Sequence, residues 1–87
     1  MNPLSQNKRF MPNFSDLTQK DWIKACNKLG LIVNQKRGKG SHCLIKHPKT
    51  NCKYTIQRHL HKFINIKIFN KMLEWGFEEE DIQKALQ

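Results

Sequence analysis

The stretch SHCLIKHPKTNCKYTIQ, residues 41–57, decides the fold, because it contains two strand-like segments and the turn between them. Apolar and polar residues alternate over 41–47 and again over 52–57, which is typical of half-buried strands. Between them, Pro48 occupies a favoured position of a tight turn over 48–51. The stretch therefore predicts an antiparallel hairpin.

The turn length sets the register of this hairpin. A four-residue turn pairs 47 with 52, 45 with 54 and 43 with 56. One face then carries Cys43, Ile45, Cys52, Tyr54 and Ile56. The other face carries His42, Leu44, Lys46, Lys53, Thr55 and Gln57. Because only the first face is apolar, we expect it to be the core and His42 to face outward.

Helices are predicted on both sides of the hairpin. Thr18 followed by Asp21 resembles a capping pattern, and apolar residues then repeat at helical spacing over 19–29 until Gly30. The later segment 63–69 alternates like a strand, but the apolar residues beyond it continue in helical register. We expect a helix over 65–75 with Asn65 as N-cap and Gly76 as its end. The acidic run 78–81 indicates the start of a short final helix.

A third strand completes the pattern. LIVNQK, residues 31–36, is rich in β-branched residues, and RGKG, 37–40, provides turn glycines. The order is helix, three-stranded antiparallel meander, helix, which predicts a two-layer α+β domain over 16–87. Residues 1–15 have neither a helical nor a strand period, and we expect a flexible N-terminal arm.

The charge balance favours an anionic partner. The 87 residues include 16 Lys+Arg against 7 Asp+Glu, a formal net charge of +9. Nucleic acid is the first class of partner that this suggests, and a membrane surface is the second. No apolar run reaches the ~20 residues that cross a bilayer. An odd number of cysteines, 3, fits a reducing compartment, so we expect a cytoplasmic protein without a membrane partner.

His42 is the first candidate for chemistry. In the predicted register it lies beside Lys46 and Lys53, while Arg37 and Lys39 project from the adjoining turn. A neutral imidazole can act as a general base near pH 7, and glycine-rich backbone can approach phosphate oxygens. The same pattern also fits a surface histidine beside a hairpin turn.

The order of several short motifs resembles the HicA family, the toxin halves of HicAB toxin–antitoxin pairs. The motifs are Gly40-Ser41-His42, His47-Pro48 and Arg58-His59, with Lys28-Leu29-Gly30-Leu31 and Trp75-Gly76-Phe77 at the helix ends. The resemblance covers about Leu17 to Phe77. The chain departs from the family pattern at Gln57, where the family usually has proline, and at Asn65-Ile66, where it usually has Gly-Thr.

The resemblance implies a fold similar to the double-stranded-RNA-binding domain and an mRNA-cleaving toxin with His42 as catalytic residue. It also implies a HicB-type antitoxin that covers the site. We expect metal-independent transesterification of single-stranded RNA, in which His42 takes the proton of a ribose 2′-OH and the lysines bind the chain and stabilise charge on the phosphorane. His59 is a candidate general acid, or a loop residue packed on the second helix. The predicted RNA-binding residues are Lys36, Arg37, Lys39, Gly40, Ser41, Lys46, Lys53, Arg58 and His59.

Three other functions stay open. A non-catalytic RNA-binding module of the same fold typically has a dense lysine cluster at the start of its last helix, and the helix predicted here offers only Lys67 and Lys71. The second is a toxin that has lost its activity. The third is a protein-binding domain whose positive charge complements an acidic partner.

A metal site or other cofactor is not expected. The candidate ligands Cys43, His47, Cys52, His59 and His61 lack the pairwise spacing of zinc sites. The predicted register places Cys43 and Cys52 toward the core but not opposite each other, which favours free buried thiols over a disulfide. Trp22 and Trp75 follow the helical patterns and are expected to pack, whereas Phe63 could stack on bases.

Overall fold

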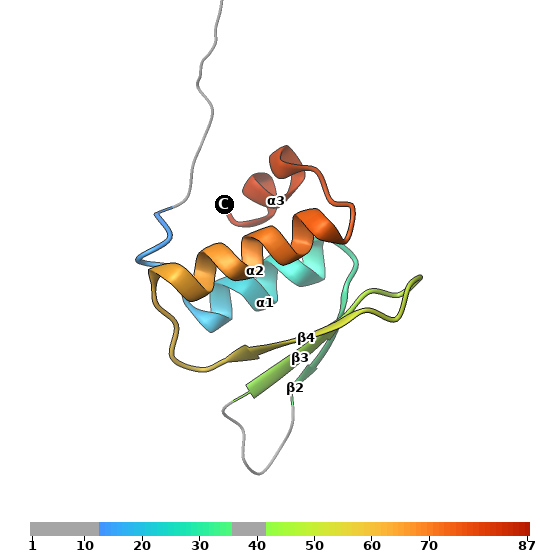
Figure 1. Ribbon diagram of the computed structural model, residues 1–87, viewed down its shortest axis with the longest axis horizontal. Helices are drawn as coiled ribbons and strands as arrows, with labels where there is room; N and C mark the ends of the chain where they lie inside the picture. The colour runs from blue at the N-terminus through green and yellow to red at the C-terminus, as the bar shows by residue number, and fades with distance from the viewer. Residues whose placement is uncertain (1–12, 36–41) are drawn as a thin grey trace, which may run out of the picture.

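The computed structural model describes residues 13–35 and 42–87, which form three helices and a three-stranded antiparallel sheet. The elements in chain order are α1 (Gln19–Lys28), β2 (Ile32–Gln35), β3 (His42–Lys46), β4 (Lys53–Gln57), α2 (Lys62–Glu74) and α3 (Glu79–Ala85). The helices cover one face of the sheet, and α3 packs against α1 and α2 (Figure 1). The α+β class expected from the sequence is confirmed.

The hairpin has the predicted register. Cys43 pairs with Ile56 and Ile45 pairs with Tyr54, and the strand order is β2-β3-β4. Cys43, Ile45 and Ile56 are buried, and Tyr54 is half-buried. The alternation of side chains along each strand therefore separates a core face from an outer face, as expected.

Cys52 corrects the predicted core face, because its side chain is exposed. It precedes β4 in the turn, where the His47 amide donates to the Cys52 carbonyl over 2.8 Å. The turn extends beyond the helices (Figure 1), so nothing from the helical layer covers this position.

The helix α1 begins and ends as the sequence predicts. The Thr18 hydroxyl accepts from the Asp21 backbone N–H, and the Asp21 carboxylate accepts from the Thr18 backbone N–H, which completes a capping box. Gly30 follows the helix with φ +83°, a conformation that favours glycine. The Gln19 side-chain amide donates to the Ile56 carbonyl over 2.9 Å and ties the helix to the sheet.

The start of α2 differs from the prediction. The helix begins at Lys62 with His61 as N-cap, and Asn65 lies inside it with its side chain fully buried. The indole N–H of Trp22 donates to Asn65 Oδ1 over 2.8 Å, and the Asn65 amide donates to the carbonyls of Phe14 and Leu17. Asn65 therefore serves tertiary contacts instead of capping a helix.

Part of the segment expected to be a flexible N-terminal arm packs against the domain. The ring of Phe14 contacts that of Phe69 edge-on, with centroids 5.4 Å apart. Residues 1–12 of the expected arm, residue 36 of the expected strand and the expected turn 37–40 lie outside the described residues.

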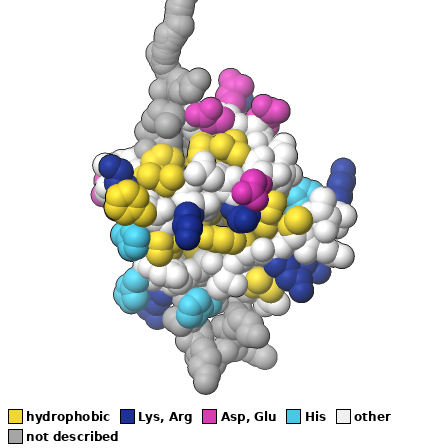
Figure 2. Space-filling model, viewed as in Figure 1, with side chains coloured by type: hydrophobic (Ala, Val, Ile, Leu, Met, Phe, Trp, Pro, Cys, Tyr) yellow, Lys and Arg dark blue, Asp and Glu magenta, His cyan; other side chains and the backbone are white. Residues whose placement is uncertain are grey.

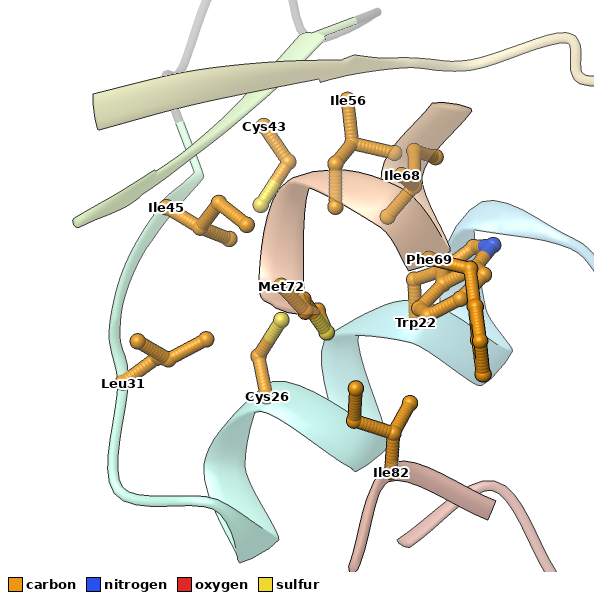
Figure 3. Packing of buried hydrophobic residues seen from close by; sticks show 10 residues of the cluster. All are labelled: Trp22, Cys26, Leu31, Cys43, Ile45, Ile56, Ile68, Phe69, Met72 and Ile82. Atoms are coloured by element: carbon orange, nitrogen blue, oxygen red, sulfur yellow. The ribbon is translucent and has the colours of Figure 1, made fainter. Parts of the chain in front are cut away.

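The core lies between the sheet and the helices. It is formed by ten buried side chains (Figure 3): Trp22, Cys26, Leu31, Cys43, Ile45, Ile56, Ile68, Phe69, Met72 and Ile82. Burial of one large apolar side chain contributes about 1.5–3 kcal/mol. The packing expected of Trp22 is confirmed, and the outer face of the sheet is left for other roles.

Candidate nucleic-acid interface

His42 is the first residue of β3 and its side chain is exposed on the outer face of the sheet. Its partner across the ladder is Gln57, the last residue of β4. Residues directly opposite in an antiparallel pair project from the same face, so the two side chains are neighbours. The outward orientation predicted for His42 is confirmed.

The two lysines of the outer face lie at the other end of the hairpin. Lys46 pairs directly with Lys53, and Leu44 and Thr55 lie between this pair and His42. Because Lys46 is four residues from His42 in one strand, their Cα atoms are ~13 Å apart at the usual rise per residue. At this separation the Lys46 side chain can reach either a phosphate bound by His42 or one that flanks it. The expectation that the lysines stabilise charge on the phosphorane stays a prediction.

The connection from β4 to α2 lies beside His42. The Gln57 side-chain amide donates to the backbone carbonyl of His59 over 3.2 Å, which holds this connection next to the end of the ladder. Arg58 and His59 are exposed. The structure thus brings His42, Gln57 and the backbone of His59 together at one edge.

Five of the predicted RNA-binding residues lie outside the described part of the chain. They are Lys36, Arg37, Lys39, Gly40 and Ser41.

His47, in the other family-like motif, has a packing role. Its ring lies 5.6 Å from that of Phe77 and 6.2 Å from that of Trp75, between centroids. Its Nδ1 accepts from the backbone N–H of Lys49 over 3.1 Å. These contacts join the β3–β4 turn to the segment between α2 and α3 and confirm the packing expected of Trp75.

The acidic residues are separated from the sheet. They are Asp16, Asp21, Glu74, Glu78, Glu79, Glu80 and Asp81, so that none occurs between Trp22 and Leu73 in the sequence. In Figure 2 most acidic side chains gather at the α3 end, while basic side chains spread over α2 and the sheet and histidines lie toward the sheet. An uneven distribution of charge of this kind attracts polyanions to the basic side and orients them as they approach.

Cys26 and Cys43 are buried and do not contribute a nucleophile to the outer face. Burial, with a smaller contribution from Cys43, raises the pKa of the Cys26 thiol from 9.0 to about 12. Burial also raises the pKa of the Cys43 thiol, although Cys43 adjoins His42 in the sequence. Within residues 13–35 and 42–87, no group of three or more His, Cys, Asp or Glu side chains is placed to hold a metal ion.

Two residues of α2 are placed differently because the helix begins earlier than predicted. The earlier start places Lys62 in the first helical turn, so the helix carries Lys62, Lys67 and Lys71. Lys71 pairs with Glu74 over 3.2 Å and lies 5.8 Å from the centroid of the Tyr54 ring. Phe63 in the same first turn is 72% exposed. The expectation that Phe63 could stack on bases stays a prediction.

No helix in the described part of the chain has the length and apolar character needed to cross a bilayer. No family model, curated protein or solved structure matches this chain.

Proposed function

We propose that this protein is an mRNA-cleaving toxin of a toxin–antitoxin pair, related to the HicA family and to the double-stranded-RNA-binding fold. The observation that carries the proposal is the position of His42, exposed at the end of a strand in a stretch of chain without acidic residues. A cationic outer face would concentrate RNA, and an exposed imidazole within it would supply acid–base chemistry.

In the proposed reaction His42 acts as general base. Its neutral imidazole takes the proton of a ribose 2′-OH as the 2′-oxygen forms a bond to the adjacent phosphorus. The bond from phosphorus to the 5′-oxygen breaks, and that oxygen receives a proton. The products are a 2′,3′-cyclic phosphate and a 5′-hydroxyl. One positioned general acid or base typically contributes ~10²–10⁴-fold to the rate.

His59 is the proposed source of the second proton. The bond from Gln57 to the His59 carbonyl supports this role, because Gln57 is also the cross-strand neighbour of His42. Two histidines on neighbouring segments could then act on opposite sides of one phosphate. Arg58 is exposed and directly precedes His59 in the sequence, and it would contact the RNA backbone.

Lys46 and Lys53 are assigned to the flanking RNA. Their cross-strand pairing places two cations together at ~13 Å from His42 along the strand. Affinity should therefore fall steeply with salt, because each phosphate contact releases counterions. A HicB-type antitoxin, the partner that the resemblance implies, would inhibit by covering this outer face.

Cleavage of a synthetic single-stranded RNA tests the proposal. We expect the wild-type protein to cut RNA and to leave a 2′,3′-cyclic phosphate in the presence of a chelator. A single 2′-deoxy nucleotide at the cut site should stop cleavage there, since the attacking oxygen is missing. His42→Ala should lower the rate by ~10²-fold or more, whereas the matched variant His47→Ala should retain cleavage.

Each contrary result points to a different function. Cleavage at a 2′-deoxy nucleotide would exclude the 2′-oxygen as nucleophile. Equal cleavage by His42→Ala would remove His42 from the mechanism. RNA binding without cleavage by the wild-type protein would favour the non-catalytic RNA-binding module or a decayed toxin. Induced expression of the same variants, followed by growth and message integrity, then tests toxicity in cells.

A further inference from the structure

Phe63 is a large aromatic side chain that the fold leaves in solvent. Its side chain is 72% exposed, although it lies in the first turn of α2. The buried face of this helix is formed by Asn65, Ile68, Phe69 and Met72. Phe63 is therefore off the core-facing side, and its ring contributes little to the stability of the domain.

The orientation of Phe63 directs it toward the site edge. Side chains on a helix lean toward its N-terminus, which here is the connection from β4. The ring of Phe63 meets that of His61 edge-on, at 6.3 Å between centroids and an interplanar angle of 72°. His61 belongs to the same connection as His59, whose carbonyl accepts the bond from Gln57. Phe63 thus lies at the end of the connection that leads from the neighbourhood of His42 into α2.

The charge around Phe63 indicates which class of ligand would bind there. Lys62 and Arg58 are exposed close to it in the sequence, and the first turn of α2 has no acidic residue. Figure 2 shows basic, histidine and apolar side chains together at the edge where β4 leads into α2. An occupant with an anionic backbone and flat apolar rings fits both properties, and single-stranded RNA has both.

We propose that Phe63, with His61 along its edge, forms a stacking platform for one unpaired base of single-stranded RNA beside the scissile phosphate. This inference rests on the proposed function, because it places the platform next to the cleaved bond. The platform would select single-stranded over duplex RNA, since bases in a duplex have no free face for an aromatic ring.

Binding of a 2′-O-methyl RNA oligonucleotide tests the platform separately from cleavage, because this probe has no attacking hydroxyl. Phe63→Leu keeps an apolar side chain but removes the flat ring, and should weaken binding about tenfold in a filter-binding assay. Phe63→Trp should restore wild-type affinity. Leu73→Ala is the matched control, because Leu73 is a partly exposed (38%) apolar residue near the other end of α2, and it should bind as wild type.

A scan with abasic nucleotides completes the test. At one position of the probe the loss of the base should weaken wild-type binding, and Phe63→Leu should then cause no further loss. Equal binding by Phe63→Leu and wild type, or no position with this behaviour, would overturn the platform even where His42→Ala abolishes cleavage. Weaker binding by Phe63→Leu in a protein that cuts no RNA would instead contradict the proposed nuclease and retain the stacking surface.

Discussion

The two histidines at the ends of β3 have the same chemistry and different surroundings. His42 begins the strand on the outer face, whereas His47 follows its last residue and packs its ring on Trp75 and Phe77. The difference follows from the alternation of the strand, because positions separated by an odd number of residues project to opposite faces. One histidine therefore contributes to the packing of the domain, and the other is exposed on the outer face. Four predictions test how the site end, the core and the His47 end of the molecule differ, from the largest expected effect to the smallest.

The first prediction tests whether His59, near the His42 end of β3, acts as the general acid. His59→Ala should lower cleavage of ordinary RNA by about 10²-fold, because the departing 5′-oxygen would lose its proton donor. The same variant should cleave RNA with a 5′-bridging sulfur at nearly the wild-type rate, since a thiolate leaves without a proton. Single-turnover rates on the two substrates provide the measurement, and His47→Ala is the control.

An equal loss on both substrates would show that His59 acts in binding or positioning and not as general acid.

The second prediction concerns the contact that holds the site end of α2. Asn65→Ala should lower the free energy of unfolding by about 2–4 kcal/mol, because the buried indole N–H of Trp22 would lose its acceptor. The carbonyls of Phe14 and Leu17 would lose a donor at the same time. Urea unfolding measures the change. Asn70→Ala is the matched control, an exposed asparagine in the same helix, and a similar loss for both variants would contradict the role of Asn65.

The third prediction tests the buried core, to which Cys26 of α1 belongs. The Cys26 thiol keeps its proton in the folded chain up to a pKa of about 12 but loses it near 9.0 when unfolded. Between these values the unfolded state binds fewer protons, so stability is complete below pH 9 and falls above it by about 1.4 kcal/mol per pH unit. Urea midpoints at pH 8, 10 and 11 measure this slope.

The slope should be smaller in Cys26→Ala and unchanged in Cys52→Ser, whose thiol is exposed. An identical slope in Cys26→Ala would exclude the buried thiol as its cause.

The fourth prediction has the smallest expected effect and concerns the other end of β3. His47→Ala should destabilise the domain by about 1 kcal/mol, because two ring contacts are lost. His42→Ala should change stability by less than about 0.5 kcal/mol, as is usual for an exposed side chain. Thermal unfolding of the two variants compares them directly, and a larger loss for His42→Ala would reverse the division between the two histidines.

The hairpin could be predicted from sequence because its determinants are local. A four-residue turn and the alternation of apolar residues place His42 outward and Ile45 inward, and no distant contact changes this. The start of α2 could not be predicted in the same way. Asn65 is a good N-cap by type, but its partner Trp22 is 43 residues earlier in the chain. Tertiary hydrogen bonds therefore decided its position.

The site was predictable to a similar degree. The outer face and its lysines follow from the register. The separation of Lys46 from His42 along β3 likewise follows from strand geometry. The position of His59 depends on a hydrogen bond from the Gln57 side chain, which no sequence pattern predicts. Phe63 was recognised as a possible stacking residue, but its exposure depends on where α2 begins.

The two tryptophans give each end of the molecule its own optical signal. Trp22 is fully buried with its indole N–H bonded to Asn65, so its fluorescence should be blue-shifted and should report the packing of the site end. Trp75 is half-buried, and its ring lies beside that of His47. Emission from Trp75 should therefore report the packing of the β3–β4 turn against the segment between α2 and α3. Single Trp→Phe variants would separate the two signals, so that loosening of either end can be followed without an added label.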